Sequence, residues 1–179
     1  MRHAAFLTAL LLGTAPAMAE MTMLGDLHIE RPMLRETPPN APVAGGYVTI
    51  VNTGEADDML IAASIAGDVA DEVQLHEMTM ADGVMTMNAV DGGIPVPAGE
   101  AVTLAPGGQH LMVMGLHQPL KAGEAHAITL TFAQAGEVTL DMPVLSLGEI
   151  RAATEEAGLM EHGAHGEGHH ADHHGTEGN

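Results

Sequence analysis

The chain has 179 residues, with 24 acidic and 5 basic side chains, a net charge of −19, 14 methionines, 12 histidines and no cysteine. This charge disfavours nucleic acid and anionic lipid as partners and favours metal cations or a basic protein surface. Without cysteine the chain has no disulfide, so its stability must come from apolar burial and backbone hydrogen bonding, and a blue-copper site, which needs a thiolate, is excluded.

The first residues have the pattern of an export signal. Arg2 precedes an apolar run from Ala4 to Leu12, and Ala17-Met18-Ala19 matches a small-x-small cleavage site. We therefore expect residues 1–19 to be a signal peptide and the mature protein to be periplasmic. No later apolar run approaches the length of a membrane span, so we expect no membrane span after signal cleavage. Because no cysteine follows the cleavage site, we also expect no lipid anchor.

Short apolar and β-branched stretches alternate with Gly, Pro, Asn and Asp over the next part of the chain, which is typical of an all-β sandwich. The predicted strands are Leu27–Leu34, Gly46–Asn52, Met59–Ile65, Glu72–Met78, Val84–Ala89, Ala101–Leu104, His110–Leu116, His126–Phe132 and Val138–Val144. We expect a single β-sandwich domain over residues 20–147. Since aromatic residues are scarce, Val, Ile, Leu and Met must fill its core, and we assign Met59, Met114 and Met142 to that core.

The composition changes at Gly148. Glu149–Met160 is compatible with a short amphipathic helix, and the sequence after it is a low-complexity mixture of Gly, His and acidic residues with nothing to bury. We expect residues 148–179 to form a flexible, metal-binding tail. Half of the histidines lie in this tail: His162, His165, His169, His170, His173 and His174. Histidines separated by a few flexible residues can bind Cu(II) through their imidazoles, and they also bind zinc and nickel.

Residues 76–87, HEMTMADGVMTM, place one histidine and four methionines in one predicted hairpin. Side chains at positions i and i+2 of a strand share a face, which pairs His76 with Met78, Met85 with Met87 and, further along the chain, His110 with Met112. A turn at Ala81-Asp82-Gly83 brings His76 near Met87 across the ladder.

Thioethers are soft and neutral and imidazole is borderline, so together they match Cu(I) better than zinc, calcium or magnesium. Methionine is also a common filler of irregular cores, and any single methionine is more often packing than ligand. The coincidence of two His-x-Met stretches favours His76, Met87, His110 and Met112 as ligands. Met78 and Met85 remain open between auxiliary ligands and packing.

The spacing of these residues resembles that of a known family. His76, ten residues, Met87, twenty-two residues and then His110-Leu111-Met112 is similar to the signature of the periplasmic copper chaperones called PCu(A)C, and segments such as AGGYVTIVNTGEADDML and IPVPAGEAVTLAPGGQHLMVMGL stand in the family's order. The second spacing is usually twenty-one in the family, and an aromatic residue commonly stands where this chain has Gln109.

The resemblance implies a cupredoxin-like Greek-key β-sandwich. It also implies Cu(I) binding through His76, Met87, His110 and Met112. The copper would be delivered towards the binuclear copper centre of cytochrome c oxidase, through the oxidase's copper-bearing subunit or a thioredoxin-like copper assembly protein.

The sequence offers no sign of an enzyme, because Ser64 and Ser146 lie in no nucleophile elbow. Two functions therefore remain. The first is a chaperone that passes Cu(I) to a partner by ligand exchange, with the tail capturing Cu(II). The second is a periplasmic metal buffer in which the tail is the main binding element and no dedicated partner exists.

Overall fold

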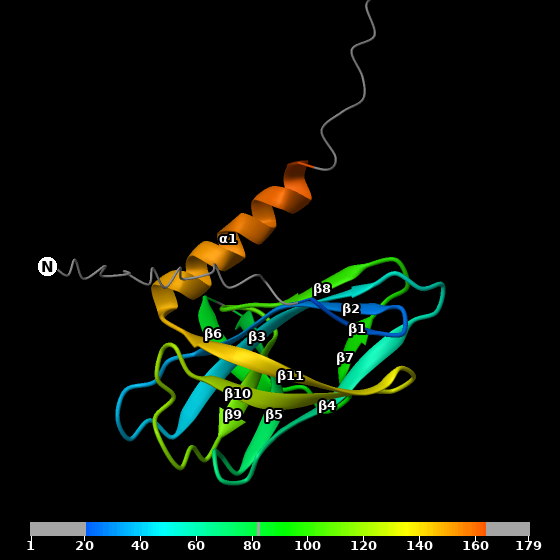
Figure 1. Cartoon of the computed structure of the whole chain (residues 1–179). Helices are drawn as coiled ribbons and strands as arrows, with labels where there is room; N and C mark the ends of the chain where they lie inside the picture. Colours follow the sequence, from blue (N-terminus) through cyan, green and yellow to red (C-terminus); the bar gives the residue numbers. More distant parts are fainter. Residues whose placement is uncertain (1–20, 82, 164–179) are drawn as a thin grey trace, which may run out of the picture.

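The computed structural model describes residues 21–81 and 83–163, without the side chains of residue 81 and residues 156–163. In this part of the chain, eleven strands precede one helix (Figure 1). The elements are β1 Thr22–Leu24, β2 Leu27–Arg35, β3 Val43–Asn52, β4 Asp58–Ile65, β5 Glu72–Ala81, β6 Val84–Ala89, β7 Ile94–Val96, β8 Ala101–Leu104, β9 His110–Met114, β10 Ala125–Phe132, β11 Gly136–Leu145 and α1 Leu147–Gly163.

The strands form one continuous sheet in the order β1-β2-β11-β10-β4-β5-β9-β3-β8, with β6 attached to β5 and β7 attached to β4. An additional pairing between β2 and β3 joins distant parts of this path, so the sheet folds over on itself into two layers (Figure 1). The pairing of β11 with β2 is parallel. The predicted all-β sandwich is therefore confirmed.

The core lies between the layers and is built by alternation along the strands. In β10 and β11 every second side chain points inward, because successive residues of a strand face opposite sides of the sheet. The buried residues of these two strands are Ile128, Leu130, Phe132, Leu140, Met142 and Val144. Burial of apolar surface contributes about 25 cal/mol per Å² to the free energy of folding. This burial stabilises the domain without disulfides.

All nine predicted strands are present, and those over Val84–Ala89 and Ala101–Leu104 have the predicted bounds. Two short strands, β1 and β7, were not predicted. Each has three residues, which is too few for a visible alternation, and β7 contains Pro95, which weakens a strand prediction.

The three methionines assigned to the core differ in their positions. Met142 is fully buried, as predicted. Met59 is half-buried. Met114 is half-buried too, and it lies opposite Glu72 on the outward face of β9, so its assignment to the core is wrong.

Helix α1 begins earlier than predicted because of a capping box. Ser146 N donates to Glu149 Oε2 at 2.8 Å, and Glu149 N donates to Ser146 Oγ at 3.4 Å. Ile150 in the first turn is buried against Met33 and Tyr47. The helix therefore occupies the first half of the segment predicted to be a flexible tail, and it extends away from the sandwich (Figure 1).

Several predictions concern residues whose structure is not described. The predicted signal peptide, residues 1–19, lies outside the described residues, as do five of the six tail histidines: His165, His169, His170, His173 and His174. His162 falls in the last turn of α1. In the described part of the chain, no helix combines the length and the apolarity needed to cross a membrane.

Candidate metal centre

The strand register gathers the predicted ligands on one face of the sheet. In the β5–β9 ladder His76 lies directly opposite His110, and Gln74 lies opposite Met112. In the β5–β6 ladder Met78 lies opposite Met87. Directly opposite residues of an antiparallel pair point to the same side. All of these side chains therefore share the outward face, whereas the neighbouring pair Leu75 and Leu111 faces the core.

The hairpin differs in detail from the sequence prediction. The residue opposite His76 in β6 is Ala89, and Met87 stands diagonally from His76. Met78, expected as a possible auxiliary ligand, is the direct partner of Met87. Met85 is opposite Met80, one step further from the histidines. The structure thus separates the two auxiliary candidates: Met78 belongs to the histidine end of the hairpin and Met85 to its tip.

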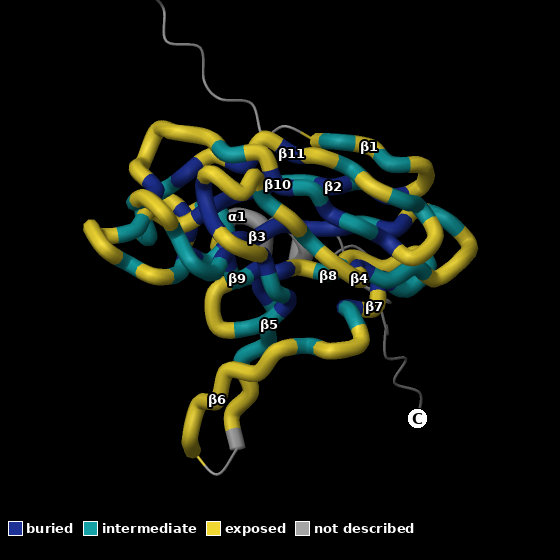
Figure 2. The backbone as a smooth tube through the Cα atoms, turned by 90° about the horizontal axis from the view of Figure 1, so that it is seen from below, coloured by how far each residue is buried: buried dark blue, intermediate teal, exposed yellow. Residues whose placement is uncertain are grey.

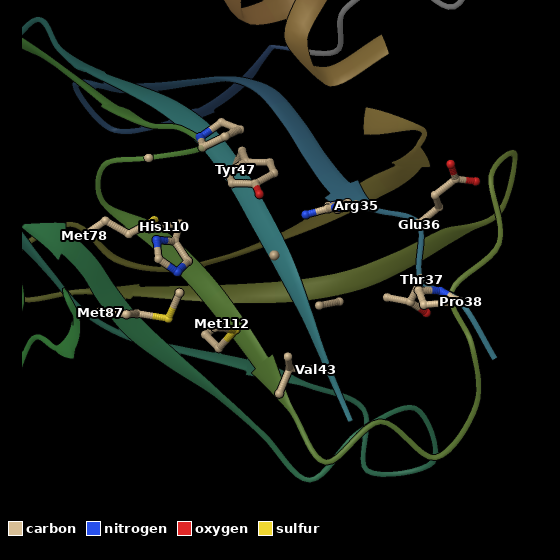
Figure 3. Close-up of a pocket in the computed structure, with 14 residues that line it drawn as sticks. Arg35, Glu36, Thr37, Pro38, Val43, Tyr47, Met78, Met87, His110 and Met112 are labelled. Carbon is tan, nitrogen blue, oxygen red and sulfur yellow. The ribbon is translucent and has the colours of Figure 1, made fainter. Parts of the chain in front are cut away.

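A surface pocket of about 460 Å³ opens beside these strands. Its wall includes three thioethers and one imidazole, from Met78, Met87, Met112 and His110 (Figure 3). The opposite wall comes from the end of β2 and the start of β3, including Arg35 and Tyr47. His76 stands next to this group rather than in the pocket wall, with its ring centroid 5.9 Å from that of His110 and the two rings tilted by 50°.

His110 is oriented by its own loop. Its ring is buried, and Nδ1 lies 3.0 Å from the carbonyl oxygen of Gly108. A carbonyl only accepts hydrogen bonds, so Nδ1 carries the proton and donates it. The other ring nitrogen, Nε2, is left with a free lone pair. Fixing the tautomer in this way is how proteins prepare a histidine for metal binding.

His76 is oriented by Gln74, from two positions earlier on the same face. Its Nε2 donates to Gln74 Oε1 at 2.9 Å, and Gln74 Nε2 in turn donates to Glu72 Oε1 at 2.7 Å, which fixes the amide. The remaining ring nitrogen, Nδ1, is buried and has no hydrogen-bond partner among the described residues. An unpaired buried nitrogen costs about 1–3 kcal/mol, and a bound metal ion would satisfy it.

Both imidazoles thus have one nitrogen committed to an oxygen and the other free. Burial, with a smaller effect from the neighbouring His110, lowers the pKa of His76 below its usual value. The neutral imidazole, which is the form that ligates metals, is therefore favoured.

Gly45 shapes the wall of the pocket beside Met112, its partner across the β3–β9 ladder. A Cβ atom at this position would lie 2.6 Å from Tyr47 Oη, so a glycine is required for the ring to lie where it does. Burial raises the pKa of the Tyr47 phenol, although Arg35 acts in the opposite direction. The pocket therefore has a neutral phenol on one side and thioethers on the other.

The described residues contain no group of three or more His, Asp or Glu side chains placed to hold a metal ion. Beside the two histidines, the other potential ligands on this face are the thioethers of Met78, Met87 and Met112. Sequence reasoning did not identify Gln74 as the partner of His76. The alternation of a strand does place positions 74 and 76 on one face. Glutamine is common on strand surfaces, however, so this position alone does not identify Gln74 as a hydrogen-bond partner of His76.

Comparison with known proteins places this arrangement in a family. Residues 27–144 match the family described as "LpqE-like: Putative lipoprotein LpqE-like". The chain belongs to this family. It is the PCu(A)C family, so the resemblance seen in the sequence is confirmed.

Individual relatives agree with this membership. The copper-bound PCuAC domain from PmoF2 is 31% identical, with a TM-score of 0.60 over 71% of this chain and 98% of that domain. The Cu(I) form of DR1885 from Deinococcus radiodurans is 27% identical, with a TM-score of 0.53 over 73% of this chain and 82% of that protein. Both share the predicted sandwich fold.

A curated relative, "Putative lipoprotein Lxx21020" of Leifsonia xyli, is 37% identical over 102 residues, which are 57% of this chain. This chain spans 60% of the length of that relative. The description of the family and of this relative as lipoproteins agrees with an exported, envelope-associated protein.

Proposed function

We propose that the protein is a periplasmic copper chaperone that carries one Cu(I) ion on His76, Met87, His110 and Met112, with Met78 adjacent to this set of four ligands but not one of them. The observation that carries this proposal is the facing pair of histidines, each with one ring nitrogen held by an oxygen and the other free. The sulfur ligands come from β6 and β9, the strands on either side of β5, and lie on the same face as the histidines.

The donor set selects the metal. Two neutral imidazoles and two neutral thioethers form a soft site that favours Cu(I), whereas calcium and magnesium require oxygen ligands and structural zinc sites use thiolates or several imidazoles. The acidic chain attracts cations in general. Two solved relatives are described as copper-bound and Cu(I)-bound, which supports copper as the cargo.

The exposure of the site favours transfer over permanent storage. Met87 is 44% exposed at the rim of the pocket, so a thioether on the outside can be replaced by a partner's ligand while the histidines still hold the ion. Stepwise ligand exchange needs no change in the oxidation state of copper. We infer that the protein acts by transfer rather than catalysis, and that the acceptor is the copper-bearing subunit of cytochrome c oxidase or a thioredoxin-like copper assembly protein.

A transfer assay tests this function. Protein loaded with one Cu(I) is mixed with the apo form of the soluble domain of the oxidase subunit, and copper is followed to the acceptor. The proposal predicts that the acceptor is metallated faster than by the same amount of Cu(I) held by a small chelator of matched affinity. Equal rates would mean that the protein only buffers copper.

The six tail histidines support a second, compatible function in which the tail captures Cu(II) and raises the local copper concentration. Changing all six to Gln should remove Cu(II) binding and leave one Cu(I) per chain. If Cu(II) affinity survives, the tail is not the Cu(II) site. If transfer fails but the tail binds metal strongly, the metal-buffer function is the better description.

A further inference from the structure

The hairpin of β5 and β6 carries a second pair of facing methionines beyond the proposed copper site. Met80 lies directly opposite Met85, two steps along the ladder from Met78 and Met87. Both pairs share one face, because alternate residues of a strand point the same way. The outward face therefore presents an unbroken series of soft donors from the two histidines to the hairpin tip.

Core packing does not explain the outer pair. Met80 is 70% exposed and Met85 is 50% exposed, and every residue of β6 is exposed. The hairpin extends from the body of the sandwich as a two-stranded arm (Figure 2). A methionine in such a position gains little from burial and is open to oxidation.

The geometry also separates the outer pair from the proposed site. Successive positions on one face of a strand are roughly 6.8 Å apart, so Met80 lies about 14 Å along β5 from His76. One ion cannot contact both. Directly opposite side chains, in contrast, have Cβ atoms only about 4.5–5.5 Å apart, and the flexible methionine side chains can bring their two sulfurs to one ion.

We propose that Met80 and Met85 form an outer site for a soft monovalent cation, and that Cu(I) enters there and moves through Met78 and Met87 to the histidine site. The ion stays in the +1 state throughout, and each copper–thioether bond that breaks is replaced by one to the next sulfur, so no proton or electron is exchanged. Two thioethers bind more weakly than two thioethers plus two imidazoles. The ion therefore moves inward. The outer site stands by itself, whereas its use as an entry point rests on the proposed function.

The outer site is tested on the full-length chain with isotope-labelled methionine methyl groups, titrated with Ag(I) as a redox-stable soft cation. The first equivalent should shift the methyl signals of Met87 and Met112, and further Ag(I) should shift Met80 and Met85 together. Met21 and Met23, which are comparably exposed but lie away from the hairpin, serve as matched controls. If Met80 and Met85 respond no more than these controls, there is no outer site.

Variants separate the two sites. In Met80→Leu/Met85→Leu the response of Met87 and Met112 to the first equivalent should persist. In His76→Ala/His110→Ala, Met80 and Met85 should still respond, whereas Met87 and Met112 should need more Ag(I) than in the unaltered protein, because two ligands of their site are gone. The Leu variant should also load Cu(I) from a chelator about tenfold more slowly at unchanged final affinity, because the outer pair raises the local concentration of the ion. An unchanged loading rate would overturn the entry role. If the only effect of Met80→Leu/Met85→Leu is a loss of self-association, Met80 and Met85 form a protein contact and not a metal site.

Discussion

Methionine serves opposite purposes in two parts of this molecule. Met142 in β11 is fully buried and belongs to the hydrophobic core. The methionines of the β5–β6 hairpin lie on the outward face, and three of them, at positions 80, 85 and 87, are largely exposed (Figure 2). Both regions are antiparallel ladders with the same alternation.

The two regions differ in the side chains that surround each methionine and in their exposure to solvent. The hairpin sulfurs share the outward face with two imidazoles that each have one free ring nitrogen, whereas Met142 shares the inward face with His126 and is enclosed by the hydrophobic core. Sequence composition alone does not distinguish the two uses. Position on the ladder does, because it decides whether a sulfur is enclosed or available to an ion.

The largest expected effect comes from removing both histidines of the outward face. His76→Ala/His110→Ala should lower Cu(I) affinity by more than about a thousandfold, because loss of even an outer-sphere partner costs about 10- to 100-fold and these are direct donors. Competition against a Cu(I) chelator measures the change. His28→Ala/His117→Ala removes two histidines elsewhere on the surface and should leave the affinity unchanged.

The core methionine should show the reverse pattern. Met142→Ala should reduce the free energy of unfolding by about 2–5 kcal/mol, since it leaves a cavity in a packed core, with little effect on copper affinity. Met87→Ala should weaken Cu(I) binding and change stability by less than about 0.5 kcal/mol, because the side chain is exposed. Denaturant unfolding and chelator competition on both variants provide the test. If Met142→Ala weakens Cu(I) binding and Met87→Ala lowers the free energy of unfolding, the assignment of these two residues to core and site is wrong.

A smaller effect is expected from the residue that orients His76. Gln74→Leu removes the acceptor of the Nε2 proton and should weaken Cu(I) binding by about 10- to 100-fold. The exposed Gln118→Leu is the control and should behave like the unaltered protein. Gln74→Glu, which keeps an acceptor at the same position, should restore much of the affinity. An unaltered affinity in Gln74→Leu would show that the hydrogen bond does not prepare the ligand.

The smallest effect concerns pH and the metal-free protein. The pKa of His76 is lowered by burial and by His110 from an ordinary value of 6.5, so folding favours the neutral ring. The associated stability is present above pH 6.5 and is lost as pH falls towards the lowered pKa. The melting temperature of the apo protein should therefore fall more between pH 7 and 5 than that of His76→Gln. Parallel curves would show that His76 does not titrate in this way.

Much of the fold follows from the sequence because alternation is strong in the long strands. The period of two also places Met114 on the outward face with Met112, which argues against its assignment to the core. The Ser146-x-x-Glu149 capping box marks the start of α1. Strands β1 and β7 are too short for any periodicity to show.

The site was only partly predictable from the residues. The expected nearness of His76 and Met87 came from the hairpin turn, a local feature. The pairing of His76 with His110 depends on the register between β5 and β9, which lie far apart in the sequence. The coincidence of two His-x-Met stretches and the family spacing suggest a shared site but do not specify this register. The partners Gln74 and the carbonyl of Gly108 depend on side-chain and loop geometry that no pattern in the sequence specifies.

X-ray absorption at the copper edge identifies directly which atoms bind the Cu(I) ion. The full-length chain with its six tail histidines changed to Gln is loaded with one Cu(I), so that only the outward face of the sandwich supplies donors. We expect Cu(I) to be bound by two nitrogen and two sulfur atoms, with the sulfur contribution lost in Met87→Leu/Met112→Leu. A shell of nitrogen and oxygen alone would contradict it.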